Sequence, residues 1–451
     1  MPNRTATVEI AKGQGGIQFR LLSSDVEHPD ALDFTQFALP HADLPPLRTR
    51  PNAMSYGDLL RIALSAHPSV QAELKQMFGA TPADQVTLQF VMATTAAEPF
   101  RWEALFNQPD CFLALNGWCS LKRIAMSSAA GTTGLRIFSA PIRMLAFLSP
   151  SGVSSREEFK AIKDALGRAR DGGLAIEATI YLGEQDLLDE AGRDAAAGAL
   201  PGIRVAPIPE NAVAIEQAIL EGPVQILHFF CHGYARDEVQ LLEFASISDH
   251  DHDDGPNPGG SIYLSADRLK QTLSALDTVW LTVLSSCSSA KEAPGLFSMA
   301  GGLTRSSSPV TIGMAEPIVF DDASLFAQAF YGRAFDIIGN ALAKLPEGAT
   351  SMIDLGPAVS HARARLHLAT QNAPADTFAR WCLPLLYERY TPLQVGRAPD
   401  EDMRKRIALV AQSLRSLASN TPHELRDQLL AMLDRSGVPS TLRPDRFGNF
   451  P

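Results

Sequence analysis

Cysteine is scarce in this sequence, and the cysteines that are present lie far apart. Five occur among 451 residues, with no pair at zinc-finger spacing and no density typical of a disulfide framework, at positions 111, 119, 231, 287 and 382. Small secreted domains and structural zinc sites both need closely spaced cysteines. The sequence therefore predicts reduced thiols in a cytoplasmic protein that needs no metal and no other cofactor.

Long apolar runs are also missing. The first eight residues lack the apolar core of a signal peptide, and no later run approaches the roughly 20 apolar residues that a helix needs to span a bilayer. We therefore expect a soluble intracellular protein that has no membrane partner.

Positive charge is in deficit. Lys and Arg number 39 against 50 Asp and Glu, which gives a formal charge of −11 and a pI near 5.4. Non-specific affinity for nucleic acid comes mainly from clustered Lys and Arg, so nucleic acid is not expected as a direct ligand. No fixed-period repeat is visible either, so a helical repeat array is not expected.

What is present is an ordinary globular composition with an alternating pattern of elements. The 45% apolar content can bury a large core, in two or three domains or in one elaborated α/β domain. Strand-like and helix-like patterns alternate from residue 142 to residue 318, which predicts a mostly parallel sheet with helices on both faces. The expected elements are strands 142–150, 174–182, 203–208, 224–231, 279–285 and 310–318 and helices 154–170, 211–220 and 265–276.

Other elements are expected on either side of this region. A helix should run from Ser55 to Phe78, with Ser55 as its N-cap and Gly79 at its end. The remaining expected elements are a hairpin and proline-marked connector up to residue 54, strands 86–92, 112–115 and 381–387, and helices 321–341, 358–369, 402–418 and 422–435.

Two of the expected strands end on residues that can do chemistry. The run from residue 224 ends on His232 and Gly233, and the run from residue 278 ends at Cys287. Ligands of parallel α/β sheets lie at the carboxyl ends of the strands, so the imidazole and the thiol can be neighbours there. An imidazole beside a thiol lowers the thiol pKa from about 8.5 and creates a nucleophile. A glycine after the histidine can offer its backbone N–H to an oxyanion.

Cys287 has serine neighbours that compete with it for the role of nucleophile. Ser285 and Ser286 come directly before it and two more serines follow, so the strand ends in a polar segment where a thiol can be reached. A serine nucleophile of the hydrolase type would need a Gly-x-Ser-x-Gly elbow, which is missing here. The sequence therefore favours the cysteine.

His228 and Cys231 lie on the same run as His232. On a helix, His228 and His232 would share a face and could bind zinc, but in a strand they lie about 13 Å apart, too far for one ion. The β-branched and aromatic run favours the strand, so we expect His228 to be a buried, hydrogen-bonded core residue. Adjacent strand side chains point to opposite faces, so Cys231 should face away from His232.

Residues 248–260 are rich in Asp, His and Gly. Carboxylates at three alternate positions from Asp249 resemble half of a calcium loop, but Gly260 stands at the twelfth position, where a bidentate Glu is needed. A mobile acidic surface loop is the preferred interpretation. A metal-tuned or substrate-engaging loop stays open, as does a metal-dependent hydrolase that uses His228, His232 and this loop.

The two strand ends resemble the His and Cys signatures of CHAT domains, the caspase-like cysteine proteases related to separase. Further segments resemble elements of that family in the same order, namely Phe100-Arg-Trp-Glu-Ala-Leu105, 312–318, 325–331, 359–366 and 381–387. The resemblance covers about residues 55 to 395. It implies an α/β fold in which a caspase-like, mostly parallel sheet is flanked by helices on both faces, with an N-terminal pseudo-caspase-like or α+β portion and a helical C-terminal tail.

With this resemblance the chain divides into four expected parts. They are an N-terminal strand and proline-rich connector (1–54), the N-terminal part of the CHAT region (55–140), a caspase-like catalytic domain (141–395) and a helical C-terminal tail (396–451).

The resemblance also implies roles for the residues at the two strand ends. His232 would be the general base or acid and Cys287 the nucleophile, while the backbone N–H groups of Gly233 and Cys287 would form the oxyanion hole.

The substrate pocket departs from the pattern of the wider clan. Many relatives carry Asp two positions before the nucleophile, where it helps to bind a basic residue before the scissile bond, but here that position is Ser285. Asp321 and Asp322, just beyond a strand end, are the alternative pocket residues.

The implied function is a cysteine endopeptidase that cleaves a specific protein partner through a thioester acyl-enzyme. The implied setting is a prokaryotic antiviral defence or regulated cell-death system, with a gasdermin or another effector encoded nearby as the substrate and a separate sensor protein as the activator. The alternative is a catalytically silent module of the same fold that serves interaction or scaffolding. The presence of His232, Gly233 and Cys287 favours the protease.

Overall fold

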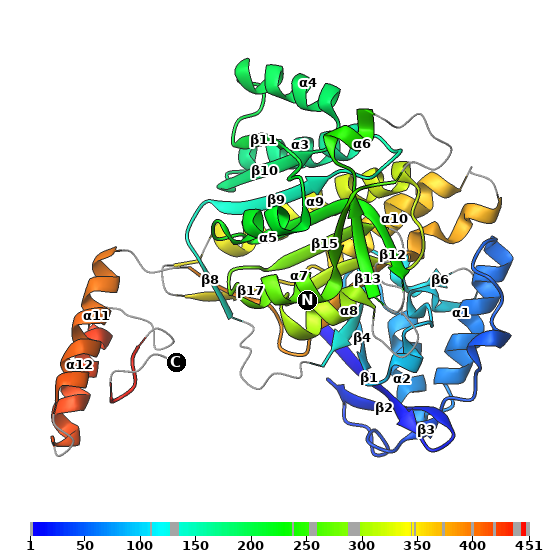
Figure 1. Cartoon of the computed structure of the whole chain (residues 1–451). Helices are drawn as coiled ribbons and strands as arrows, with labels where there is room; N and C mark the ends of the chain where they lie inside the picture. Colours follow the sequence, from blue (N-terminus) through cyan, green and yellow to red (C-terminus); the bar gives the residue numbers. More distant parts are fainter. Residues whose placement is uncertain are drawn as a thin grey trace.

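One large sheet forms the centre of the molecule (Figure 1). The computed structural model describes residues 3–108, 111–126, 135–236, 239–251, 259–286, 298–343, 345–346, 349–371, 375–397, 401–417, 421–435 and 443–447. Within these residues the strands run in the order β11-β10-β9-β12-β15-β16-β18-β7-β4-β1-β2-β3, and β13 and β14 extend β12.

The strands of this sheet come from almost the whole chain. In sheet order they are β11 (Ile203–Pro207), β10 (Ile176–Leu182), β9 (Ile142–Leu148), β12 (Ile226–Arg236), β15 (Leu281–Ser286), β16 (Val310–Met314), β18 (Pro384–Arg389), β7 (Cys119–Ala125), β4 (Gln85–Met92), β1 (Asn3–Gly13), β2 (Gly16–Ser24) and β3 (Thr35–Gln36), with β13 (Val239–Phe244) and β14 (Ile262–Ser265). A small separate sheet joins β17 (Thr350–Met352), β19 (Gln394–Arg397) and β8 (Leu135–Phe138), and a two-stranded one joins β5 (Phe106–Asn107) and β6 (Cys111–Phe112).

Most neighbouring strands are parallel, as the sequence predicts. The run from β11 to β16 is parallel throughout. The run from β18 through β7 and β4 to β1 is parallel as well, and the two runs meet at the antiparallel pair of β16 and β18. The predicted mostly parallel α/β sheet is therefore confirmed.

Helices cover both faces of this sheet, again as predicted. One buried core joins the sheet to α1 (Arg50–Leu64), α2 (Pro68–Phe78), α3 (Arg156–Asp171), α4 (Gln185–Ala196), α9 (Phe320–Ala343) and α10 (Gly356–Thr370). A second core joins the opposite face to α5 (Ala212–Leu220), α7 (Ala266–Ser274) and α8 (Met299–Ser306). Along β12 the side chains alternate between the cores, since Phe230 packs in the first core while Phe229 and Cys231 pack in the second.

The predicted helix from Ser55 to Phe78 is in fact two helices. Proline is well tolerated in the first turn of a helix but not in its interior. Pro51 therefore lies in the first turn of α1, whose N-cap is Thr49 rather than Ser55, and Pro68 begins α2. Gly79 ends α2 as predicted.

Two short strand predictions differ from the structure. The segment 112–115 is a strand only at Phe112, because residues 113–115 form a single 3-10 turn. The closing strand begins at Pro384 rather than at residue 381, because the preceding residues form the 3-10 helix η5 (Ala375–Cys382).

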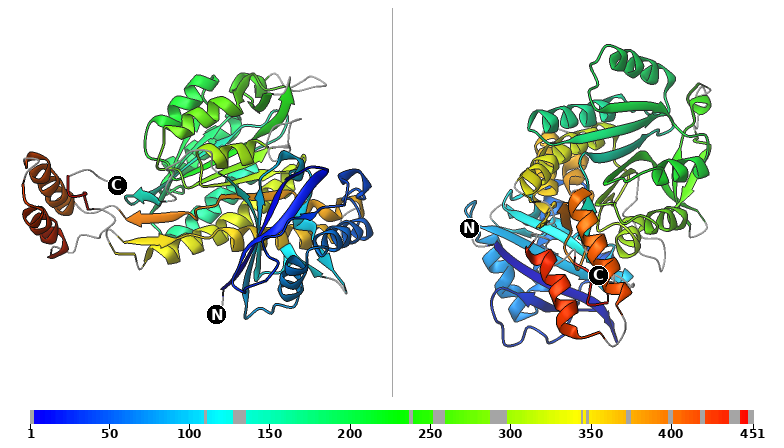
Figure 2. Two further views of the ribbon diagram at one scale, coloured as in Figure 1. Left: turned by 90° about the horizontal axis from the view of Figure 1, so that it is seen from below. Right: turned by 90° about the vertical axis from the view of Figure 1, so that its left-hand side faces the viewer.

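The C-terminal tail is helical, as predicted. Its helices α11 (Glu401–Ser416) and α12 (His423–Arg435) form a hairpin that stands apart from the sheet (Figure 2). The hairpin has a small core of its own around Val410, Leu414 and Leu433. Among the helices of the described residues, we find none with the length and apolar character that crossing a bilayer requires.

Candidate functional site

β12 and β15 lie side by side at the centre of the sheet. Their parallel register runs from Ile226 opposite Leu281 to Cys231 opposite Ser286. The next residues along the two chains are His232 and Cys287. Cys287 itself lies outside the described residues, as do the ten residues that follow it, so the structure places the residue before the thiol.

His232 lies where β12 leaves the large sheet and begins to pair with β13. It is half-buried and stands opposite Glu243, and Gly233 stands opposite Leu242. The His232 Nε2 atom is 2.7 Å from the carbonyl oxygen of Ser151. Because a carbonyl can only accept, Nε2 carries the hydrogen, and in the neutral ring Nδ1 is then the basic nitrogen.

Ser151 belongs to the segment between β9 and α3, which is fixed near its start by Ser149. The Ser149 N–H donates to the Phe230 carbonyl of β12 at 2.9 Å. Its carbonyl accepts from the Ala245 N–H at 2.9 Å, and its hydroxyl donates to the Ala245 carbonyl. The segment that carries the Ser151 carbonyl is therefore hydrogen-bonded, through Ser149, to β12 and to the residue after β13.

We predict that Gly183→Ala will disturb this segment. A Cβ at Gly183 would lie 1.8 Å from Ser149 Oγ and 3.0 Å from the Ala245 carbonyl oxygen. Overpacking of this kind costs about 1–3 kcal/mol, which urea unfolding would measure. Gly192→Ala on α4 is the matched control, because nothing lies within 4 Å of its added Cβ, and it should gain about 0.5–1 kcal/mol through helix propensity. Equal midpoints for Gly183→Ala and the unchanged protein would contradict the prediction.

His228 is a buried core residue, as predicted. Its side chain has no exposed surface, and its Nδ1 lies 2.9 Å from the hydroxyl of Tyr331. Its Nε2 lies 3.0 Å from Oε1 of Glu158, which is equally buried. Cys231 packs in the core on the other face of the sheet, again as predicted.

The loop rich in Asp and His lies mostly outside the described residues, at 252–258. At its start, Asp249 accepts hydrogen bonds from the backbone N–H of Ser246 and from the N–H and hydroxyl of Ser261. The Asp249 carboxylate thus ties the two described ends of the loop together. Within the described part of the chain, no group of three His, Cys, Asp or Glu side chains could hold a metal ion.

The residues expected in the substrate pocket lie in different surroundings. Ser285 is 1% exposed, and its hydroxyl has no hydrogen-bond partner among the described residues. Asp321 is exposed in the first turn of α9. Asp322 is buried, which raises its pKa, although Arg380 Nη1, 3.1 Å from Oδ2, opposes the rise. Their role in a pocket stays a prediction.

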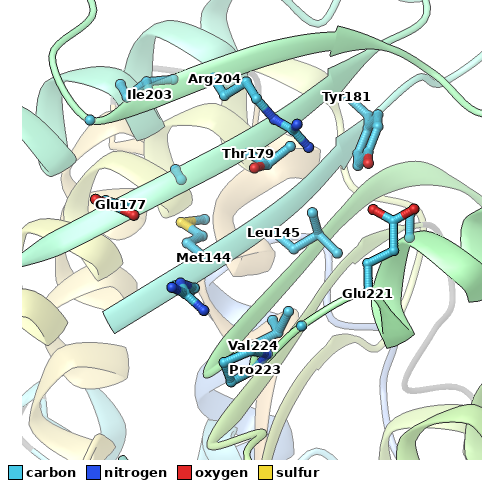
Figure 3. A pocket seen from close by; sticks show the side chains of 15 residues that line it. Met144, Leu145, Glu177, Thr179, Tyr181, Ile203, Arg204, Glu221, Pro223 and Val224 are labelled. Carbon is cyan, nitrogen blue, oxygen red and sulfur yellow. The ribbon is translucent and has the colours of Figure 1, made fainter. Parts of the chain in front are cut away.

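A cavity of about 520 Å³ lies away from these strand ends (Figure 3). It is bounded by the amino-terminal half of β9, by β10 and β11, and by the end of α5 with the turn that follows it. A second cavity of about 630 Å³ shares Tyr181, Ala218 and Glu221 with it and reaches residues 246–248 beyond β13. The sequence predicted neither cavity, because each is formed by residues from several separate elements.

Comparison with known proteins gives a match to a family model. A family model described as "CHAT domain" matches residues 63–343, which is more than half of the chain. A search of curated protein sequences found no match.

Several solved structures resemble the chain at low similarity. A chain of the Saccharomyces cerevisiae separase–securin complex has a TM-score of 0.36 and 12% identity; the match covers 76% of this chain and 18% of that one, so this chain spans less than a fifth of it. Gingipain R, described as an Arg-specific cysteine proteinase, has a TM-score of 0.38 and 9% identity, with 73% and 67% covered. The complex of Porphyromonas gingivalis RgpB pro- and mature domains has a TM-score of 0.36 and 9% identity, with 74% and 69% covered.

Proposed function

Because the chain belongs to the CHAT domain family, we propose that it is a cysteine endopeptidase with Cys287 as nucleophile and His232 as general base and acid. The observation that carries this proposal is the register of β12 and β15. Cys231 stands opposite Ser286, and one residue further along each chain come the imidazole and the thiol. Neighbouring strands of a sheet lie about 4.8 Å apart, which suits proton transfer between side chains at adjoining strand ends.

The hydrogen bond to Ser151 supports the proposed role of His232. With Nε2–H donating to that carbonyl, Nδ1 takes the proton of the Cys287 thiol. The thiolate attacks the scissile carbonyl, and the negative oxygen of the tetrahedral intermediate is bound by the backbone N–H groups of Gly233 and Cys287. The imidazolium gives its proton to the leaving amine and a thioester forms. A water molecule, deprotonated by His232, then hydrolyses the thioester, and the thiol is regenerated.

The proposed substrate is a specific protein partner. The family resemblance favours a prokaryotic defence or regulated cell-death system, with a gasdermin or another effector encoded nearby as the target and a separate sensor as the activator. Ser285 stands where clan relatives carry the aspartate that binds a basic residue, and its side chain is buried. We therefore propose Asp321 or Asp322, rather than residue 285, as the acidic residue of the substrate pocket.

Co-expression with neighbouring gene products tests this function. The expected result is a new fragment of one product that appears with the unchanged protein and is missing with Cys287→Ala. An active-site alkylating probe should label the unchanged protein and not Cys287→Ala. Labelling that survives the substitution, or no labelling with any candidate activator present, would instead favour a silent interaction module.

A further inference from the structure

Three buried ionisable side chains meet under the strand that carries His232. They come from three elements: Glu158 from α3, His228 from β12 and Tyr331 from α9. All three are 0% exposed. His228 Nδ1 is 2.9 Å from the Tyr331 hydroxyl, and His228 Nε2 is 3.0 Å from Glu158 Oε1. The imidazole thus connects the two helices through the sheet strand between them.

The contact with Tyr331 determines which nitrogen of His228 accepts a hydrogen bond and which carries the hydrogen. Burial and the nearby Glu158 raise the pKa of Tyr331 well above its usual value, so its phenol stays protonated and can donate to His228 Nδ1. The neutral imidazole then carries its hydrogen on Nε2, on the side of Glu158. The Nε2–H then faces Glu158 Oε1 at 3.0 Å in a polar contact whose geometry falls short of a hydrogen bond.

Glu158 departs from the local pattern of its own helix. It stands three residues after Ser155, the N-cap of α3, where a glutamate commonly reaches back to cap the helix. Here it turns inward instead, and the Ser155 N–H donates to Glu184. Burying a carboxylate costs several kcal/mol in lost hydration, so a well-packed apolar side chain would serve stability better. The contact with His228 therefore needs a reason other than packing.

The same two segments of chain are joined at His232. Ser151 lies in the segment between β9 and α3, and Glu158 lies in the first turn of α3. His232 and His228 lie four residues apart on β12. The Ser149 N–H joins this part of the chain to Phe230 of β12, the Ser151 carbonyl joins it to His232, and Glu158 joins it to His228.

We propose that Glu158, His228 and Tyr331 are positioning residues that hold the Ser151 carbonyl in place against His232 Nε2. This inference rests on the proposed function, because it gives the contact between Glu158 and His228 a role in keeping the basic nitrogen of His232 directed at the thiol. The three side chains do not touch the reacting atoms; they act through the start of α3.

The test is the pH dependence of Cys287 alkylation in Glu158→Met, which has similar volume and no charge. Iodoacetamide is the probe, and the Cys287 peptide is followed by mass spectrometry. If the imidazole is misplaced, the thiol reverts towards an ordinary pKa, and the rate at pH 7 should fall about tenfold. At pH 10 the thiol ionises without help, so the rates should converge. Because unfolding would also give an ordinary thiol, the circular dichroism of Glu158→Met has to match that of the unchanged protein for the profile to count.

Two further variants keep the test decisive. Glu158→Gln retains an acceptor oxygen for His228, so its alkylation rate at pH 7 should stay close to that of the unchanged protein. Tyr331→Phe removes one hydroxyl and should give an intermediate loss even if Glu158→Met folds poorly.

The chain offers a matched control in Glu73 on α2, a buried carboxylate whose Oε1 lies 2.6 Å from Nε2 of His28. Glu73→Met should leave the alkylation profile unchanged. Equal losses in Glu73→Met and Glu158→Met, or a Glu158→Met profile that matches the unchanged protein, would overturn the positioning role. An ordinary thiol profile in the unchanged protein would instead overturn the proposed dyad itself.

A second measurement does not depend on the thiol. In protein labelled with ¹⁵N-histidine, the His232 Nε2–H signal can be assigned by its loss in His232→Gln. We expect the signal to shift or broaden in Glu158→Met and to stay unchanged in Glu73→Met. An unchanged signal in Glu158→Met would contradict the inference whether or not the protein proves to be a protease.

Discussion

Replacing His232 with glutamine should lower the rate of peptide-bond hydrolysis by about 10²- to 10⁴-fold, the usual contribution of a general acid and base. Glutamine can still donate an amide N–H to the Ser151 carbonyl, so the contact that His232 makes at 2.7 Å has a replacement. What glutamine lacks is a nitrogen that accepts the thiol proton and returns it to the leaving amine. The loss should therefore fall on kcat more than on KM.

The measurement is the initial rate of cleavage of the fragment-yielding partner, or of a peptide that spans its cleavage site. His361→Gln is the matched control, because His361 is exposed on α10, and its rate should equal that of the unchanged protein. The two variants should also differ in alkylation, with His232→Gln slowed near neutral pH and His361→Gln unaffected. A His232→Gln enzyme as fast as the control would remove this residue from the mechanism.

The two strands that lead to His232 and Cys287 could be predicted from the sequence, because the residues of each strand indicate it without reference to distant parts of the chain. The runs before His232 and Cys287 are short, β-branched and aromatic, which is typical of buried parallel strands. The structure confirms both strands and shows that they pair in parallel up to Cys231 and Ser286. The thiol lies outside the described residues, so the dyad stays a prediction.

The partner of His232 could not be predicted in the same way. The acceptor is a backbone carbonyl, that of Ser151, and every residue has one, so no residue type marks it. It lies 81 positions earlier in the chain, and only the parallel pairing of β9 with β12 brings it near. The burial of the Glu158 side chain could not be predicted either, because its spacing from Ser155 is that of an ordinary capping glutamate.

The sequence predicted the strands on either side of the candidate site and missed β7, where charges interrupt the apolar pattern. β7 is buried along its whole length yet contains Lys122 and Arg123, which made this segment unlike a central strand. Both charges are neutralised by distant residues, since Lys122 Nζ lies 3.0 Å from Glu388 and Arg123 Nη2 lies 2.9 Å from Glu103. Only the folded chain shows that such residues can lie in a core.

Glu103, the partner of Arg123, belongs to a buried charge network that joins the N-terminal and C-terminal halves of the sheet. Glu103 receives two hydrogen bonds from Arg123 on β7 and lies 3.8 Å from Arg363 on α10. These three side chains have no exposed surface. Arg123 also donates to the Glu98 carbonyl at 3.0 Å, and Arg363 donates to the Pro384 carbonyl at the start of β18.

The protonation of Glu103 should couple this network to pH. Burial alone would raise the Glu103 pKa, but Arg123 and Arg363 outweigh it and hold the pKa below its usual value. A carboxylate whose pKa is lower in the folded chain stabilises the fold above its unfolded pKa, about 4.3. This contribution is lost as the pH falls through the folded value. At pH 7 it is fully present.

We therefore expect Glu103→Gln to lower the free energy of unfolding at pH 7 by about 3–5 kcal/mol, because it leaves two buried guanidinium groups without a full counter-charge. Denaturation in urea at pH 7 measures the loss. Arg156→Met is the contrasting change, since Arg156 pairs with Glu190 while 40% exposed, and such surface pairs contribute about 1 kcal/mol or less. If the two variants unfolded at the same urea concentration, the buried network would not be what holds the halves of the sheet together.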